Sequence, residues 1–240
     1  MTGKRIILEA DGLGKRFGRE VVLKAASFTA TEGTITALMG RNGAGKTTMF
    51  RIAVGRLRPD YGRVAYRGRY LPRPSLARLA PEGLLYITQR SALTPLISVQ
   101  GHLDAFARTY NGQDRLARAV EELRLGWVLD RRPATLSGGE KQRASLALAL
   151  VRDPACLLMD EPFAGVAPLD RPLIARGLQR LKEGGAAVVI TGHDVDDLFD
   201  VSDEVIWVTA GTTHWLGDPH QAAAHHQFRQ EYLGPRGGSA

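Results

Sequence analysis

The residues best suited to chemistry lie in a glycine-rich segment. It fits the pattern G-x-x-x-x-G-K-[ST], in which small residues let successive backbone N–H groups curl around a phosphate. An expected strand precedes it and an expected helix follows it, and that helix adds the positive end of its dipole. Lys46 would reach the β- and γ-phosphates of a nucleotide, and the Thr47 hydroxyl would take one Mg²⁺ position. The expected phosphate-binding residues are Gly40, Asn42, Gly43, Ala44, Gly45, Lys46, Thr47 and Thr48.

Two adjacent carboxylates follow an apolar run that predicts a buried strand over residues 155–159. Ligands of open α/β sheets bind off the carboxyl ends of the strands. We therefore expect Asp160 to hold Mg²⁺ through water, and Glu161 to act as general base toward the attacking water. An acidic pair alone is usually a solvated strand end, but a phosphate loop in the same chain requires such an acid.

His193 follows another expected strand, residues 186–191, in the same way. A lone histidine is more often a surface or core residue. At this strand end, however, the side chain would lie where the γ-phosphate is expected, which favours a catalytic positioning role. His225 and His226 could bind a metal, but no further ligands with metal-site spacing accompany them.

Strands and helices alternate along the chain, which indicates an α/β fold with a mainly parallel sheet covered on both faces. Proline-rich residues 71–82 are expected to form a surface connection. The strands are predicted at residues 6–8, 21–23, 34–39, 64–66, 83–88, 155–159, 186–191 and 205–208. The helical segments are predicted at residues 46–56, 98–129, 137–152 and 173–182.

Composition excludes several classes of protein. With 44% hydrophobic and 24% charged residues, the 240-residue chain is typical of a globular protein. Its net charge of +7 suits nucleotides, nucleic acid or anionic lipids, but a general richness in arginine is the favoured explanation. Cys156, the only cysteine, allows no intrachain disulfide and fits a reducing compartment. No signal sequence is expected, and no apolar stretch approaches the roughly 18 residues of a membrane span. A membrane role would therefore need partner chains.

A further motif, Leu136-Ser137-Gly138-Gly139-Glu140, precedes the helix expected at residues 137–152. It resembles the signature motif of ABC-type ATPases, and its context matches as well, with a proline before it and Gln142-Arg143 after it. Ser137 would cap a helix whose free N–H groups can bind an anion. In that family the anion is the γ-phosphate held by the opposite subunit. The resemblance thus implies nucleotide contacts by Ser137, Gly138, Gly139 and Glu140.

The resemblance covers residues 4–234 and implies roles for three more positions. Phe17 matches the aromatic residue that stacks on adenine, with core packing as the alternative, and Val22 would also contact the base. Gln89 matches the catalytic glutamine that senses Mg²⁺ and connects to a helical lobe. Residues 160–166 and 231–234 look most similar to ATPases of branched-chain amino acid uptake and lipopolysaccharide export.

The family implies a P-loop NTPase core, with a mainly parallel sheet flanked by helices and an antiparallel β part, plus a small helical subdomain. Residues 1–240 would form a single domain. Residues 1–89 and 154–234 would form the core, residues 90–153 the helical subdomain, and residues 235–240 a disordered tail. The implied ligands are ATP and Mg²⁺.

The implied activity is ATP hydrolysis at the interface of two face-to-face ATPase subunits, identical or related, which drives transport by transmembrane permease subunits. The protein would be cytoplasmic, on the inner face of the cell membrane through those partners, with no specific nucleic acid. Two alternatives stay open, namely a soluble ABC ATPase of translation or DNA repair and an ATP-binding regulator without turnover.

Three positions depart from the family pattern. Ala167 stands seven positions after the first acid of the pair, where the family usually has the aspartate that links the two active sites. Leu169-Asp170 could take that role only with an insertion of three residues. Leu148 replaces a frequent arginine, and Gly192 precedes the histidine where threonine is usual. None of these changes removes a catalytic group.

Overall fold

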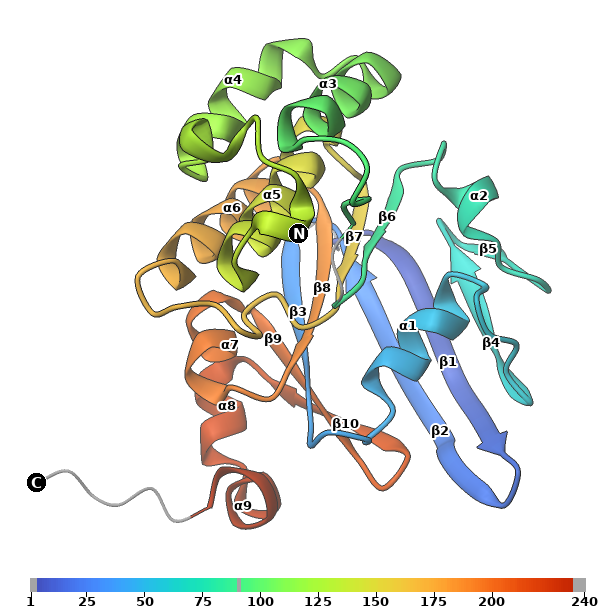
Figure 1. The fold of residues 1–240 in the computed structure, drawn as a ribbon. Coiled ribbons are helices and arrows are strands. Elements are labelled where there is room, and N and C mark those ends of the chain that lie inside the picture. Colours follow the sequence, from blue (N-terminus) through green and yellow to red (C-terminus); the bar gives the residue numbers. More distant parts are fainter. Residues whose placement is uncertain (1–3, 90–91, 235–240) are drawn as a thin grey trace, which may run out of the picture.

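The computed structural model describes residues 4–89 and 92–234 (Figure 1). Within these ranges the strands form one ten-stranded sheet in the order β5-β4-β1-β2-β10-β9-β3-β8-β7-β6. The strands are β1 (Ile6–Phe17), β2 (Glu20–Thr31), β3 (Thr34–Met39), β4 (Tyr61–Tyr66), β5 (Arg69–Tyr70), β6 (Leu84–Ile87), β7 (Cys156–Met159), β8 (Ala187–Gly192), β9 (Glu204–Thr209) and β10 (Thr212–Gly217). The predicted α/β class, with a mainly parallel sheet and an antiparallel β part, is confirmed.

The helices cover the sheet and extend beyond it. Figure 1 shows α3 and α4 at one end of the molecule, away from β1, β2 and β4. The α-helices are α1 (Lys46–Ala53), α2 (Leu76–Leu79), α3 (Val99–Tyr110), α4 (Gln113–Glu122), α5 (Gly138–Arg152), α6 (Arg171–Glu183), α7 (Val195–Val201), α8 (Pro219–Ala224) and α9 (His226–Phe228). The 3₁₀ or π turns are η1 (Gly126–Val128), η2 (Pro133–Thr135) and η3 (Arg229–Leu233).

The parallel part of the sheet positions the candidate site. β3 lies between β8 and β9, and β7 lies between β6 and β8, all in parallel register. Every residue of β3, β6, β7 and β8 is buried, as expected for strands covered on both faces. Alternate side chains enter two cores. Leu157 and Met159 pack with α3, α5 and α6, whereas Cys156 and Leu158 pack with α1 and the antiparallel strands.

The antiparallel part differs from the sequence prediction. β1 and β2 are twelve residues each, far longer than the predicted strands at residues 6–8 and 21–23. Register shifts, including one between Ala10 and Leu13, break the alternation that a sequence pattern detects. β10 was not predicted at all, because it is only partly buried and short of apolar residues. Its hairpin with β9 turns at Ala210 and Gly211, both with positive φ.

Several helix boundaries also differ. The helix predicted at residues 46–56 ends at Ala53, where Gly55 adopts a left-handed turn, and α2 lies within the expected surface connection. The helical stretch predicted at residues 98–129 consists of α3, α4 and η1. The division at residues 89/90 and 153/154 stays a prediction, and residues 235–240 lie outside the described residues.

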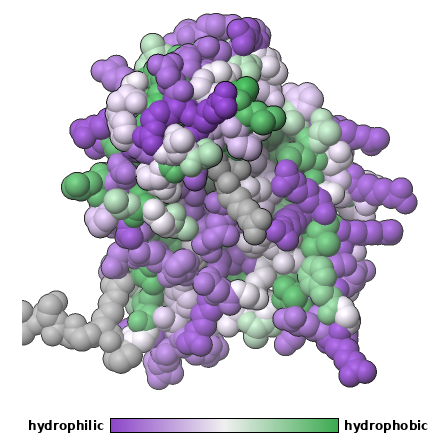
Figure 2. All heavy atoms as spheres, in the orientation of Figure 1, coloured by the Kyte–Doolittle hydropathy of each residue, from purple (hydrophilic) through white to green (hydrophobic). Residues whose placement is uncertain are grey.

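No helix among the described residues is long and apolar enough to cross a bilayer. Figure 2 shows one face on which hydrophilic and hydrophobic residues are interspersed.

Burial raises the pKa of the Cys156 thiol well above its usual range, so this cysteine is an inert part of the core.

Candidate active site

The predicted phosphate loop connects β3 to α1 in a backbone shape that needs glycine at specific positions. Gly45 has a φ of 102°, and a Cβ there would lie 2.5 Å from Leu23 Cδ2 and 3.4 Å from Val22 Cγ1. A Cβ on Gly40 would lie 2.4 Å from the Val208 carbonyl oxygen. The loop therefore packs tightly against β2 and β9, with the N-terminus of α1 at its end.

Lys46 is buried within this loop, 5% exposed. Its Nζ donates to the carbonyl oxygens of Gly40 at 2.6 Å and Arg41 at 3.2 Å. Burial lowers the pKa of Lys46, an effect that the carboxylates of Glu161 and Asp160 oppose. Phosphate oxygens at this position would supply the compensating negative charge that two neutral carbonyls do not.

Asp160 is 2% exposed at the end of β7 and accepts two hydroxyl hydrogen bonds. Thr47 Oγ1 donates to Asp160 Oδ2 at 2.8 Å, and Thr191 Oγ1 donates to Asp160 Oδ1 at 2.5 Å. Three elements thus converge here: α1, β7 and β8. The hydroxyl of Thr47 and the carboxylate of Asp160 are hard oxygen donors of the type that Mg²⁺ prefers. Thr191 was not predicted as a site residue, although it lies near the end of a parallel strand, where ligand-binding residues are expected.

The other two residues predicted to be catalytic, Gln89 and His193, lie close to the Glu161 carboxylate. Gln89 Nε2 donates to Glu161 Oε2 at 3.1 Å, and His193 Nδ1 lies 3.7 Å from Glu161 Oε1. The backbone of Glu161 is left-handed, with a φ of 52°, and its N–H donates to Thr191 Oγ1 at 3.0 Å. Such a conformation in a non-glycine residue is a strained one that occurs often at active sites.

The segment after β8 carries His193, whose side chain is about half exposed. Glu161, Thr191 and His193 contribute to the walls of a cavity of about 160 Å³. Arg171, at the start of α6, fixes the residues that follow the histidine. Its Nη1 lies 3.1 Å from Asp194 Oδ2 and 2.8 Å from Asp197 Oδ2. Sequence inspection gave no reason to single out Arg171.

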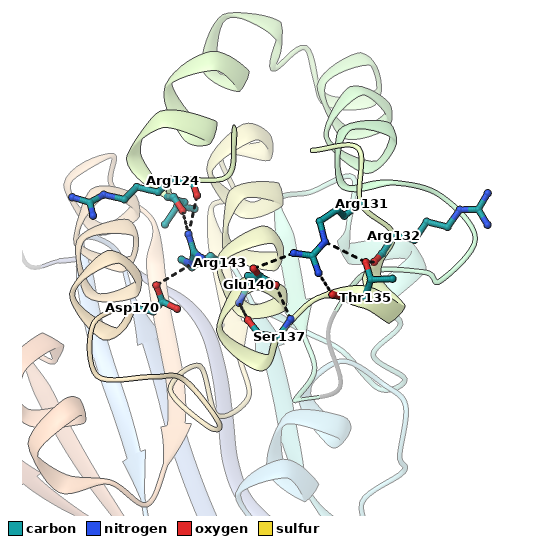
Figure 3. Close-up of polar contacts among 9 residues, drawn as sticks. Arg124, Arg131, Arg132, Thr135, Ser137, Glu140, Arg143 and Asp170 are labelled. Carbon is teal, nitrogen blue, oxygen red and sulfur yellow. Dashed lines mark hydrogen bonds and ion pairs between the residues drawn. The ribbon is translucent and has the colours of Figure 1, made fainter. Parts of the chain in front are cut away.

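The predicted signature motif begins α5, and Figure 3 shows the polar contacts that hold it. Ser137 Oγ accepts from the Glu140 N–H at 3.2 Å, and Glu140 Oε2 accepts from the Ser137 N–H at 2.7 Å. This reciprocal pair is a capping box. Arg131 extends it, with Nη1 at 3.4 Å from Glu140 Oε1 and Nη2 donating to the Thr135 carbonyl.

A second arginine, Arg143, lies on α5 itself and links this helix to neighbouring segments (Figure 3). Buried Arg143 donates through Nη1 to the carbonyl oxygens of Leu123 at 2.7 Å and Arg124 at 2.9 Å. Its Nε lies 3.5 Å from Asp170 Oδ1. Ser137 and Gly138 are exposed, whereas Gly139 and Glu140 are buried. Further along the same helix, Gln142 Nε2 donates to the Glu161 carbonyl oxygen at 3.4 Å.

The two positions predicted to contact the base lie on different strands. Phe17 ends β1 with 46% of its surface exposed, and Lys15 Nζ is 5.6 Å from its ring centre. This exposure does not fit the alternative of core packing. Val22, on β2, packs against the phosphate loop beside Gly45.

The three departures from the family pattern have clear environments. Ala167 is exposed, and its carbonyl accepts from the Asp170 N–H at 2.9 Å. Asp170 pairs with Arg143 of its own chain, while Leu169 is 91% exposed. Leu148 is buried in the core. A Cβ on Gly192 would lie 2.9 Å from Leu198 Cδ1, so glycine suits this packing.

Comparisons with known proteins agree on one family. The family model described as ABC transporter matches residues 23–164. The lipopolysaccharide export system ATP-binding protein LptB of Haemophilus influenzae is 33% identical, over 95% of this chain and 97% of the relative. The ATP-binding cassette MJ1267 of an ABC transporter, in its ADP conformation, superposes with a TM-score of 0.81 at 24% identity, over 95% and 99% of the two chains. A dimeric structure of the cassette MJ0796 bound to ADP and Pi has a TM-score of 0.76 at 23% identity, over 88% and 99%.

Proposed function

The chain belongs to the ABC transporter family, and from this premise we propose how its own residues bind and hydrolyse ATP. It is the ATP-binding subunit of a transporter and an ATPase, as its relatives are. Both predictions are thereby confirmed, and the alternatives, a soluble translation or repair ATPase and a regulator without turnover, are not favoured. The resemblance to lipopolysaccharide export proteins suggests export of a lipid-linked substrate, a narrower proposal that rests on sequence likeness alone.

We assign the phosphates of ATP to residues 40–48, with Lys46 as the principal cation. Thr47 and Asp160 would hold Mg²⁺, which neutralises phosphate charge when bound. Glu161 would accept a proton from the attacking water, since it lies beside Asp160 but projects toward Gln89 and His193. This convergence of Gln89, Glu161 and His193 is the observation that carries the proposal. Phe17 and Val22 would contact adenine.

A second subunit would complete the site. Ser137, Gly138, Gly139 and Glu140 surround the N-terminus of α5, whose N–H groups and dipole favour an anion. In a face-to-face dimer this helix would reach the γ-phosphate held by the partner. The dimeric arrangement of the similar cassette MJ0796 supports the idea.

Transmembrane permease subunits are the proposed membrane partners, which would place the protein on the cytoplasmic face of the membrane. The segment after Gln89 exposes two large apolar side chains, Leu96 at 77% and Ile97 at 41%. Exposed apolar side chains of this kind suit a protein–protein contact. We expect Leu96→Ser to lower co-purification of permease from detergent-solubilised membranes while basal ATP turnover is kept. The same substitution at exposed Leu169 is the control, and equal loss in both variants would argue against this docking position.

Phosphate release by the purified chain tests the catalytic assignment. Turnover should require Mg²⁺ and stop when the metal is chelated. Glu161→Gln should lower turnover by about 10²- to 10⁴-fold, the usual contribution of a general base, and should keep ATP binding. Glu183→Gln, on an exposed part of α6, is the matched control and should change little. Unchanged turnover in Glu161→Gln would remove Glu161 from its proposed role.

A further inference from the structure

The C-terminal turn reaches two loops of the candidate site. Tyr232, in η3, donates its hydroxyl hydrogen to the His193 carbonyl oxygen at 3.1 Å. The preceding residue, Glu231, accepts at its carbonyl oxygen from Arg41 Nη2 at 3.0 Å. Two consecutive residues near the end of the described chain thus contact the histidine segment and the phosphate loop.

A stack of aromatic rings determines where the Tyr232 hydroxyl points. The Tyr232 ring stacks on Phe228, with centres 5.2 Å apart and planes 24° from parallel. Phe228 is fully buried and meets the edge of Trp207 at 5.5 Å. Trp207 belongs to β9 and pairs with Met39, the residue before the phosphate loop. Through these rings, Tyr232 packs against β9, the neighbour of β3, which leads into the phosphate loop.

A cavity of about 410 Å³ adjoins this turn, and Arg41, Ala44, Trp207 and Tyr232 are among the residues that line it. Burial raises the pKa of Tyr232 to about 12. A hydrogen bond with the backbone of Gly40 and the charge of Arg41 oppose this shift, and the charges of Asp194 and Glu161 add to it. At neutral pH the side chain thus keeps the proton that it donates.

The imidazole of His193 is only partly enclosed, although Arg171 pairs with Asp194 and Asp197 just after it. The histidine side chain is 52% exposed, and the 3.7 Å separation from Glu161 is longer than a hydrogen bond. We propose that Tyr232 is a positioning residue for His193, whose carbonyl it anchors so that the imidazole faces the γ-phosphate of ATP. The inference rests on the proposed role of His193 and adds to it a specific source of alignment outside the recognised motifs.

The test uses binding in a Glu161→Gln background, where ATP is not consumed. Dissociation constants for MgATP and MgADP are measured for four proteins. These are the Glu161→Gln variant itself and the same variant with Tyr232→Phe, with His193→Ala, or with both substitutions added. Tyr232→Phe keeps the stacked ring and removes only the hydroxyl. Loss of one hydrogen bond should weaken MgATP binding about two- to tenfold and leave MgADP binding unchanged, because ADP has no γ-phosphate. Tyr70→Phe, exposed on β5, is the control and should alter neither constant.

The double variant shows whether the tyrosine acts through the histidine. If it does, Tyr232→Phe causes no further loss once His193 is alanine. The inference would be overturned if the two substitutions weakened MgATP binding independently, so that their fold-changes multiplied in the double variant. It would also be overturned if Tyr232→Phe weakened MgATP and MgADP binding equally. A normal MgATP constant in Tyr232→Phe, with a weakened one in His193→Ala, would overturn the inference and leave the histidine's role intact. A normal constant in His193→Ala would instead contradict that role itself.

Discussion

Asp160 and Glu161 are neighbours in sequence but have different surroundings, which explains how adjacent carboxylates can do different work. Asp160 is almost fully buried and accepts hydrogen bonds from Thr47 and Thr191. Glu161 has a left-handed backbone and contacts Gln89. A buried carboxylate that accepts two hydrogen bonds suits a fixed metal ligand, whereas the second carboxylate, near Gln89 and His193, is the one proposed to act on water.

Tyr86 gives a residue-level prediction about pH. It is 7% exposed on β6, and burial is the main cause that raises its pKa from 10.0 to about 12. The folded state therefore keeps the proton between pH 10 and 12, while the unfolded state ionises. Below pH 10 this tyrosine should not reduce the free energy of unfolding. As the pH rises from 10 toward 12, the free energy of unfolding should fall by about 2–3 kcal/mol, since one pKa unit corresponds to about 1.36 kcal/mol.

Urea unfolding at pH 9.5 and pH 11.5 measures this effect. Other groups also titrate in that range, so the comparison is with Tyr86→Phe, which keeps the ring beside Phe50. The wild-type protein should lose more stability than the variant over the interval. Equal losses would show that Tyr86 contributes no pH dependence.

The side chains proposed to be catalytic could be identified from sequence because each stands in a short motif or directly after an apolar strand. Lys46, Asp160, Glu161 and His193 all satisfy that condition. Arg171 and Tyr232 could not be predicted to act at the site, since they reach it through tertiary contacts from α6 and η3. Thr191 is an intermediate case, since its strand was predicted but its bond to Asp160 was not.

At the scale of elements, two helices begin with the same kind of cap. Ser137 caps α5 at the predicted signature motif, and Ser98 caps α3, accepting from the Gly101 N–H at 3.2 Å. Both caps satisfy a backbone donor that would otherwise be unpaired. They differ in that only the N-terminus of α5 is proposed to face a phosphate.

Alanine at these two caps separates stability from catalysis. Ser137→Ala and Ser98→Ala should each lower the free energy of unfolding by about 1 kcal/mol, the usual value of an N-cap. Only Ser137→Ala should also slow ATP turnover, because the cap aligns the N–H groups offered to the γ-phosphate. Urea unfolding and phosphate release measure the two effects. Equal slowing in both variants would indicate a general loss of rigidity instead.

The accuracy of the predicted strand positions depends on how local the sequence signal of each strand is. β3, β7 and β8 are continuous apolar runs, which explains why their positions were found closely. β1 and β2 were found only in part, because bulges between them disturb the period-two pattern. β10 pairs with β9 and β2 through backbone bonds, with few apolar residues to mark it. Such pairing depends on the whole sheet.

At the scale of the whole molecule, the fold brings together the phosphate loop, Asp160, Glu161 and His193 at the ends of its parallel strands. We propose that these residues form one half of a reaction centre. The N-terminus of α5 is held by contacts of Arg131 and Arg143 and is proposed to serve the partner's site. Two copies facing each other would bring each α5 to the other's phosphates, so ATP would join the subunits and its hydrolysis would release them.

The molecular mass of Glu161→Gln in solution tests this account most directly. With MgATP the protein should have twice the 26.1 kDa mass of one chain, and with MgADP the mass of one chain. Adding Ser137→Asp should prevent the dimer but not ATP binding, because aspartate still caps the helix while its charge repels the partner's phosphates. Ser98→Asp should leave the dimer intact. An ATP-bound Glu161→Gln protein that stays at 26.1 kDa, or a dimer that persists with Ser137→Asp, would contradict the composite site.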